Sequence, residues 1–310
     1  MPVRFRNFTM EPGFSDDFHQ VRNFLVRINA KNPIPQYHFE WGRWEWAFSL
    51  PFLDIANQHR IGIWESGGEI VALASYEDKP GFAYFCVDEA HSALKTEMLA
   101  YAREHLSDEH GKLKVLINNA DREFQQAAAR YGFKPTQDRE AVSVMDIDLA
   151  AIDYSLPPGF AVACLAEGVD ILKFNKLLWR GFNHEGEPPT TPEDLADRRK
   201  SLSGPHLDLR LCIVVVSPDG EYASYCGMWY DPDTEYALVE PVATDPVYRK
   251  MGLGKAAVLE GIRCCGQAGA RQAYVGSSQQ FYYQIGFHPL PAGTFWQNQQ
   301  IEFISIRSIR

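Results

Sequence analysis

The sequence predicts an α+β protein that contains two copies of one unit, and three observations carry this prediction. Each half of the 310-residue chain has two apolar strands joined by a glycine-bearing turn, at 60–77 and at 210–231. A further strand and an amphipathic helix follow in both halves. Each half then closes on a short helix that ends in a GFxP turn, with Gly132 and Gly286 one repeat apart. A duplicated domain is the simplest explanation of such an internal repeat.

In the first copy, residues 16–29 predict an opening helix, and the hairpin at 60–77 leads to an apolar strand at 82–87. Apolar residues recur at helical spacing over 93–106, which predicts a helix there. A strand at 112–117 comes next.

The second copy repeats this order, with a helix at 168–182, the hairpin at 210–231 and a strand at 236–244. A helix at 254–265 and a strand at 271–276 follow. We expect each copy to form a mixed, mostly antiparallel sheet flanked by helices.

The boundary between the copies is predicted near residue 150, because a Pro-Pro-Gly run at 157–159 is typical of a linker. This gives two predicted domains, 1–150 and 151–310. Each is long enough to bury its own core.

Composition excludes several classes of function. The formal net charge of -10 is unfavourable for a nucleic-acid-binding protein, which needs a basic face. The N-terminal segment lacks the apolar core of a signal peptide, and the longest apolar runs are too short to span a bilayer. We therefore expect a cytoplasmic protein without membrane association.

Cysteine and histidine spacing predicts neither a disulfide framework nor a metal site. The chain has no CxxC and no HExxH motif, and its nine histidines are scattered. We expect reduced thiols within the core at the six cysteines, which are Cys86, Cys164, Cys212, Cys226, Cys264 and Cys265.

The run VEPVATDPVYRKMGLGKAA at 239–257 leads from a strand into a helix through a loop with two glycines and three cations. A dinucleotide-binding fingerprint would need its glycines directly after the strand, whereas DPVYRKM intervenes. A Walker A loop would need a glycine at Arg249 and a Ser or Thr at Ala256. What remains is an RxxGxG pattern at a helix N-terminus, which suits a pyrophosphate because free backbone N–H groups and the helix dipole favour an anion.

This loop resembles motif A of the GCN5-related N-acetyltransferases (GNAT family), whose R/QxxGxG/A loop holds the pyrophosphate of acetyl-coenzyme A (acetyl-CoA). The FYYQIGF run at 281–287 is similar to the closing FYxxxGF element of the same family. The resemblance implies two tandem GNAT-like domains, with acetyl-CoA bound by the second. The cofactor residues it implies are Val242, Ala243, Thr244, Arg249, Lys250, Met251, Gly252, Leu253, Gly254 and Lys255.

The resemblance also implies direct transfer of an acetyl group to a bound amine. Tyr282 matches the tyrosine that the family commonly uses as general acid, although neighbouring Tyr283 could be the residue that points inward. Glu240 is the candidate base, and strand alternation predicts that it shares a face with Val242 and Thr244. Its carboxylate could instead only bind the ammonium or pair with an arginine.

Two further stretches are candidates for acceptor binding. The acidic stretch at 183–199 contains Glu185, Glu187, Glu193, Asp194 and Asp197 and would attract a cationic amine, unless it is only a solvated surface. The aromatic run WGRWEWAF at 41–48 places Trp41, Trp44 and Phe48 in one helical stripe. We interpret that stripe as core or domain interface in preference to a ligand cage.

The first copy departs from the family pattern. Its loop lacks both glycine and arginine, and Ala128 stands where the second copy has Tyr282. We therefore expect that only the second copy binds a cofactor. The predicted function is N-acetylation of a small, cationic amine by a monomer or homodimer, and the alternative is a non-catalytic acyl-CoA-binding sensor or interaction protein.

Overall fold

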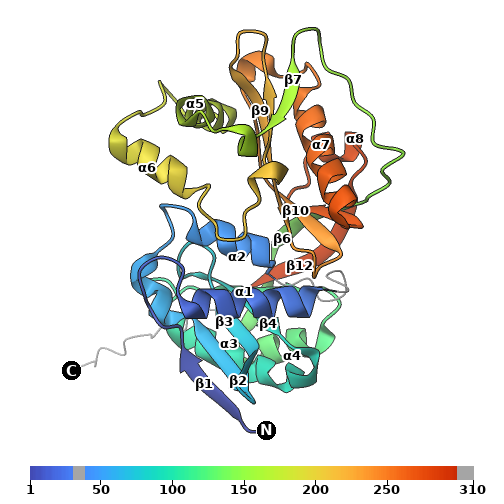
Figure 1. The fold of residues 1–310 in the computed structure, drawn as a ribbon. Coiled ribbons are helices and arrows are strands. Elements are labelled where there is room, and N and C mark those ends of the chain that lie inside the picture. Colours follow the sequence, from blue (N-terminus) through green and yellow to red (C-terminus); the bar gives the residue numbers. More distant parts are fainter. Residues whose placement is uncertain (31–38, 299–310) are drawn as a thin grey trace, which may run out of the picture. The chain divides into compact units, whose positions relative to one another are not determined.

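The computed structural model describes residues 1–30 and 39–298, and these form two compact units (Figure 1). The first unit contains residues 1–10, 54–140 and 293–298. The second unit contains the described residues of 11–53 together with 141–292. The units are thus interleaved along the chain, and the division into domains 1–150 and 151–310 stays a prediction.

The first unit is a mostly antiparallel sheet with helices. Its strands lie in the order β1-β2-β3-β4-β5-β12, and the only parallel neighbours among these described strands are β4 and β5. The elements are β1 (Val3–Asn7), η1 (Ile55–Arg60), β2 (Gly62–Ser66), β3 (Glu69–Ser75), β4 (Phe82–Val87), η2 (Glu89–Leu94), α3 (Lys95–His105), β5 (Lys114–Asn118), α4 (Arg122–Arg130) and the later part of β12 (His288–Asn298).

The second unit repeats this plan with the strand order β6-β11-β10-β9-β8-β7, in which β10 and β11 are parallel. Its helices are α1 (Asp16–Asn29), α2 (Trp41–Phe48), η3 (Leu165–Glu167), α5 (Ile171–Gly181), α6 (Pro192–Lys200), η4 (Leu209–Leu211), η5 (Pro246–Tyr248), α7 (Leu253–Ala268) and α8 (Gln280–Gln284). Its strands are β7 (Ala161–Cys164), β8 (Ile213–Val216), β9 (Tyr222–Tyr230), β10 (Tyr236–Thr244), β11 (Gln272–Val275) and the later part of β6 (Phe133–Asp146).

Each sheet contains a strand from the other half of the sequence. Residues 143–146 of β6 pair antiparallel with β11 in the second unit. Conversely, residues 293–297 of β12 pair antiparallel with β5 in the first unit. Each unit is therefore completed by a segment that follows the GFxP turn of the opposite copy.

Helices α1 and α2 come early in the sequence but pack in the second unit. Ser15 caps α1 by accepting from the Phe18 N–H, and two aspartates in the first turn favour the positive end of the helix dipole. Gly42 of α2 lies so close to β9 that a Cβ there would be 2.7 Å from the Cβ of Trp229. This close approach places α2 directly against β9 of the second unit.

The second unit has an apolar cluster on each face of its sheet. One cluster joins β8, β9 and β10 to α7, with Val258 and Ile262 fully buried. The other joins the opposite face to α5 through Phe174, Leu178 and Tyr225. Burial of these side chains drives both helices onto the sheet.

The predicted fold class, an α+β protein with tandem GNAT-like sheets, is confirmed. The predicted strands 82–87 and 236–244 coincide with β4 and β10. Over the described residues, no helix is long and apolar enough to cross a membrane. The same residues contain no cluster of three or more His, Cys, Asp or Glu suited to a metal ion. The six cysteines are free thiols.

Candidate functional site

The site is built where β10 and β11 separate. The two strands pair in parallel only from Tyr236 to Leu238, after which β10 continues to Thr244 with β9 as its one partner strand among the described residues. Val242, Ala243 and Thr244 therefore have a β10 edge without a neighbouring strand. Unpaired strand edges are places where an extended ligand can bind.

A bulge in β10 decides which face Glu240 occupies. The β9–β10 register shifts between Val239 and Val242, and Gly227 of β9 makes room for it, because a Cβ there would lie 2.6 Å from the Glu240 carbonyl oxygen. Beyond the bulge, Val242 packs on the α7 face and Ala243 on the α5 face. The expectation that Glu240 shares a face with Val242 is therefore wrong, because the extra residue reverses the alternation.

The loop after β10 presents a row of free backbone N–H groups. Gly252, the N-cap residue of α7, is left-handed at φ +82°, and Lys250 is left-handed at φ +64°. Among the described residues, no protein acceptor takes the N–H groups of residues 250–255, and the first helical bond is donated by the Ala256 N–H. These six amides, which have no acceptor in the described chain, lie at the N-terminus of a 16-residue helix, an arrangement suited to an anion.

Glycine at position 254 brings this loop close to the end of β10. A Cβ there would be 3.0 Å from the Thr244 Oγ1 and 3.5 Å from the ring of Phe281. The amide loop and the open β10 edge are therefore adjacent parts of one site. A pyrophosphate on the loop and an extended thioester arm along the edge both fit this arrangement.

The cations of the loop differ in their contacts. Arg249 donates from Nη2 to the Gly181 carbonyl at 2.8 Å and from Nε to the Thr244 carbonyl at 3.2 Å, so it braces the loop against α5 and β10. Lys250 and Lys255 form no ion pair within the described part of the chain. These two lysines are available to balance the charge of a phosphate.

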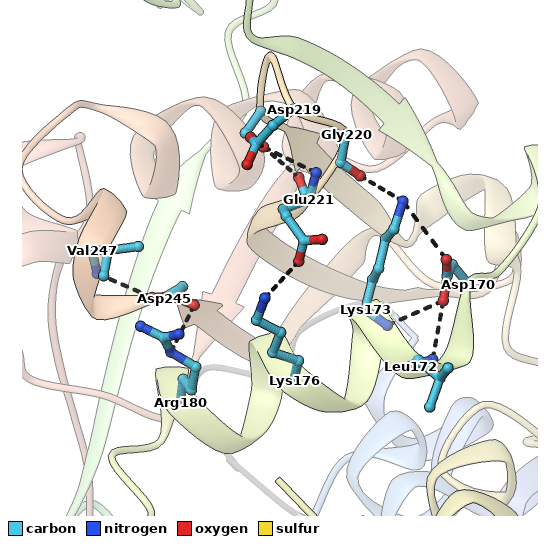
Figure 2. A network of polar contacts seen from close by, with 11 residues as sticks. Asp170, Leu172, Lys173, Lys176, Arg180, Asp219, Gly220, Glu221, Asp245 and Val247 are labelled. Atoms are coloured by element: carbon cyan, nitrogen blue, oxygen red, sulfur yellow. Dashed lines mark hydrogen bonds and ion pairs between the residues drawn. The ribbon is translucent and has the colours of Figure 1, made fainter. Parts of the chain in front are cut away.

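Helix α5 holds the start of the loop through a second contact, which Figure 2 shows. Asp245 is buried, accepts from the Val247 N–H at 3.0 Å, and pairs with the Arg180 Nε at 3.0 Å. One turn earlier on α5, Lys176 pairs with Glu221 at 2.9 Å, and this interaction raises the pKa of Lys176. Cations at helical spacing on α5 thus fix the ends of β9 and β10 relative to the helix.

Tyr282 lies in α8 and is 7% exposed, within the apolar cluster that includes α7. Its ring packs edge-to-face on Phe281 and Phe287. Burial raises the pKa of Tyr282 above its usual value, and the charges of Cys226 and Glu240 raise it further. Tyr283, the alternative, is less buried and is not part of this cluster. The hydroxyl of Tyr282 is therefore held protonated at neutral pH.

A cavity of about 470 Å³ lies on the α5 face of β10, within the second unit. Glu240 and Pro241 form part of its wall, next to the open edge that begins at Val242. Aromatic side chains of α2 and α5, and of the residues that follow each helix, form much of the rest, namely Trp46, Phe52, Phe174, Trp179 and Phe182. The volume is in the range of small-molecule sites.

The acidic stretch contributes only partly to this cavity. Asp194 and Asp197 of α6 line it, whereas Glu185, Glu187 and Glu193 are exposed and do not. Trp41, Trp44 and Phe48 are buried, so their interpretation as core is confirmed. Trp46, which lies outside that stripe, is the residue of the aromatic run that reaches the cavity.

Sequence reasoning missed Arg180, Asp245 and Arg198. The first two had a detectable signal, since Lys173, Lys176 and Arg180 follow helical spacing opposite a loop that begins with an aspartate. Arg198 lies in the charged run of α6 and had none, because only the fold shows that it lines the cavity.

Comparisons with known proteins bear on the family and the fold of this chain. A family model described as the acetyltransferase (GNAT) family matches residues 171–287. A search of curated protein sequences finds no match.

Solved structures share the fold at low sequence identity. A GCN5-related N-acetyltransferase from Sphaerobacter thermophilus has a TM-score of 0.56 at 16% identity, covering 96% of this chain and 95% of that one. A tandem GNAT protein from the clavulanic acid biosynthesis pathway has a TM-score of 0.57 at 16% identity, with 96% and 98% covered. A GNAT-family acetyltransferase from Colwellia psychrerythraea has a TM-score of 0.56 at 10% identity, with 96% and 100% covered.

These likenesses extend over both units, so the tandem arrangement is a property of the fold and not only of the matched segment. The open strand edge, the amide loop and the helix α7 all lie within residues 171–287. Residues 171–287 therefore match the acetyltransferase (GNAT) family, within a chain that has the tandem GNAT fold.

Proposed function

We propose that the protein is an acetyl-CoA-dependent N-acetyltransferase whose second unit acetylates a small amine. The carrying observation is the row of free amides at residues 250–255, which lies next to the open edge of β10. The loop would hold the pyrophosphate through its N–H groups, with Lys250 and Lys255 as counter-charges. Val242, Ala243 and Thr244 would pair with the pantetheine arm.

The cavity beside Glu240 is the proposed acceptor site. It opens on the segment of β10 that directly precedes the proposed thioester position. Its carboxylates, Glu240, Asp194 and Asp197, favour a cationic ligand, while its aromatic walls favour an apolar body. A small ammonium compound with an apolar part fits both features.

Acetyl-CoA supplies the acetyl group as a thioester. The amine nitrogen would attack the thioester carbonyl carbon and the C–S bond would break, which gives the N-acetylated amine and the CoA thiolate. Glu240 would accept the proton that the ammonium must lose before its nitrogen can attack. Tyr282, which is protonated at neutral pH, would donate its hydroxyl proton to the departing thiolate. A backbone N–H on the edge of β10 would donate to the developing oxyanion.

The test is an acceptor panel with the full-length protein and acetyl-CoA, in which free thiol is measured and acetylated products are identified by mass. We expect thiol release above background with at least one primary amine. Binding of CoA without transfer to any amine would instead support the alternative, a non-catalytic acyl-CoA sensor. Lack of CoA binding in calorimetry would reject the site itself.

A further inference from the structure

Arg198 of α6 is a cation that lines the cavity. Its Nε donates to the Asn175 Oδ1 at 3.0 Å. Within the described ranges, 1–30 and 39–298, its Nη1 and Nη2 atoms have no hydrogen-bond partner and no carboxylate lies within ion-pair distance. A guanidinium has five N–H donors, so most of its binding capacity is unused.

A guanidinium with unused donors is unusual in surroundings such as those of Arg198. The side chain is half-buried, and burial lowers its pKa, an effect that the charge of Asp197 opposes. Burying a charge without a partner costs free energy. A guanidinium kept in this position at a cavity wall is therefore suited to an anionic group that arrives with the ligand.

Asn175 of α5 shows that the position is built and not incidental. It is 3% exposed, and its Nδ2 donates to the Pro189 carbonyl at 2.7 Å while its Oδ1 accepts from Arg198. The amide thus links α5, the segment before α6, and the guanidinium. One end of this buried amide is anchored at Pro189, and the other end accepts from the cavity cation.

We propose that the acetyl acceptor is an amino-acid-like zwitterion whose carboxylate binds Arg198 while its amine lies toward Glu240. An apolar side chain would pack on Trp46, Phe52 and Trp179, which line the same cavity. This inference rests on the proposed function and names the substrate class of that site. The cavity carboxylates attract the amine of such a molecule, and Arg198 attracts its carboxylate.

The experiment compares acceptors that differ only in the carboxylate. L-Phenylalanine is paired with phenethylamine, and L-leucine with 3-methylbutylamine, in steady-state assays with acetyl-CoA. We expect kcat/KM to be higher for the amino acid in at least one pair. Arg198→Gln should lower that kcat/KM about 100-fold, with little change for the decarboxylated partner, because a desolvated charge pair is lost. Arg199→Gln, the adjacent exposed arginine, is the control and should change it less than about twofold.

A binding measurement keeps this test separate from catalysis. Quenching of tryptophan fluorescence is followed on titration with N-acetyl-L-phenylalanine and with N-acetylphenethylamine. Binding of the first only, lost in Arg198→Gln, would support the carboxylate site even if no amine were acetylated. Equal turnover of both members of each pair would overturn the inference and leave the proposed function standing, and so would equal binding of both probes. Binding of neither probe and turnover of no amino acid would also overturn it.

Discussion

The two copies keep the same sheet but treat the helix N-terminus differently. In the second unit, β10 ends at Thr244 and the short η5 follows, yet among the described residues no acceptor takes the N–H groups of 250–255 before α7. In the first unit, β4 ends at Val87 and η2 follows at once. That short 3-10 helix bonds its own amides, the Asp88 side chain accepts from the Ala90 N–H, and the Lys95 N–H donates to the Ser92 carbonyl.

The lysines near the two helix N-termini also differ in their ion pairs. Lys95 at the start of α3 pairs with Asp121, whereas Lys250 and Lys255 have no ion pair in the described chain. The separation of the parallel strands is nonetheless kept, since β4 pairs with β5 only at Phe82 and Ala83. The sheet and its strand separation are thus common to both units, whereas the run of amides without an acceptor at 250–255, where we propose that an anion binds, lies in the second unit.

The largest effect is expected from Gly252→Asp. The residue is left-handed and sits in the middle of the free amides, so a carboxylate there adds both strain and repulsion of the phosphates. We expect CoA affinity to fall by at least about 100-fold, measured by calorimetry. Gly252→Asn tests the charge alone, because asparagine tolerates this conformation. Ser92→Asp in the first unit should leave CoA binding unchanged; a matching loss there would erase the distinction between the copies.

Tyr282→Phe tests another difference between the copies, since the first copy has the buried Ala128 where the second has Tyr282. Removing only the hydroxyl should lower kcat about 100-fold while the affinity for CoA stays within about twofold. Tyr283→Phe is the control. If acetyl transfer is unchanged in Tyr282→Phe, Tyr282 has no role in the mechanism.

Arg180→Met removes the partner of the buried Asp245 at the start of the loop. The side chain of Asp245 is 5% exposed, so an unpaired carboxylate should lower the free energy of unfolding by about 1–3 kcal/mol. We expect CoA affinity to fall about tenfold in the same variant, because the loop loses a support. Lys176→Met breaks a more exposed pair and should cost less than about 0.5 kcal/mol in thermal denaturation. Equal effects of both changes would argue against a specific role of Arg180.

The smallest effect concerns pH. Burial, and then the charges of Cys226 and Glu240, raise the pKa of Tyr282 above its usual 10.0, so its neutral form persists where a free tyrosine ionises. The kcat profile should therefore show no decline from Tyr282 ionisation between pH 8 and about 10. Because the folded state holds this proton more tightly, its contribution to stability is complete below about pH 10 and is lost at higher pH. A decline of kcat near pH 9 that disappears in Tyr282→Phe would contradict this.

Much of the fold was predictable because its signals are local. Alternation and helical spacing predicted β4, β10 and α1, and the glycine pattern predicted the loop before α7. The assignment of α1 and α2 to the second unit was not predictable, since it depends on contacts such as the Arg22–Asp231 ion pair over 209 positions. The β10 bulge was also missed, because Pro241 alone does not tell where register shifts.

The candidate site also contains residues that the sequence predicts and one that it does not. The loop and Tyr282 follow from short motifs, and Asp194 and Asp197 were noted for their charge. Arg198 could not be singled out among neighbouring arginines, because burial against Asn175 distinguishes it from Arg199 and no sequence pattern encodes that contact.

The exchanged strands bear on how the molecule can form during synthesis. The first sheet has its β5 edge joined by residues 293–297, which the ribosome makes after nearly all of the second unit. Residues 143–146, by contrast, are ready before the strand they join. Pairings between such distant segments fold slowly because long loops must close first. The first copy, though translated earlier, is therefore the one whose sheet is finished last.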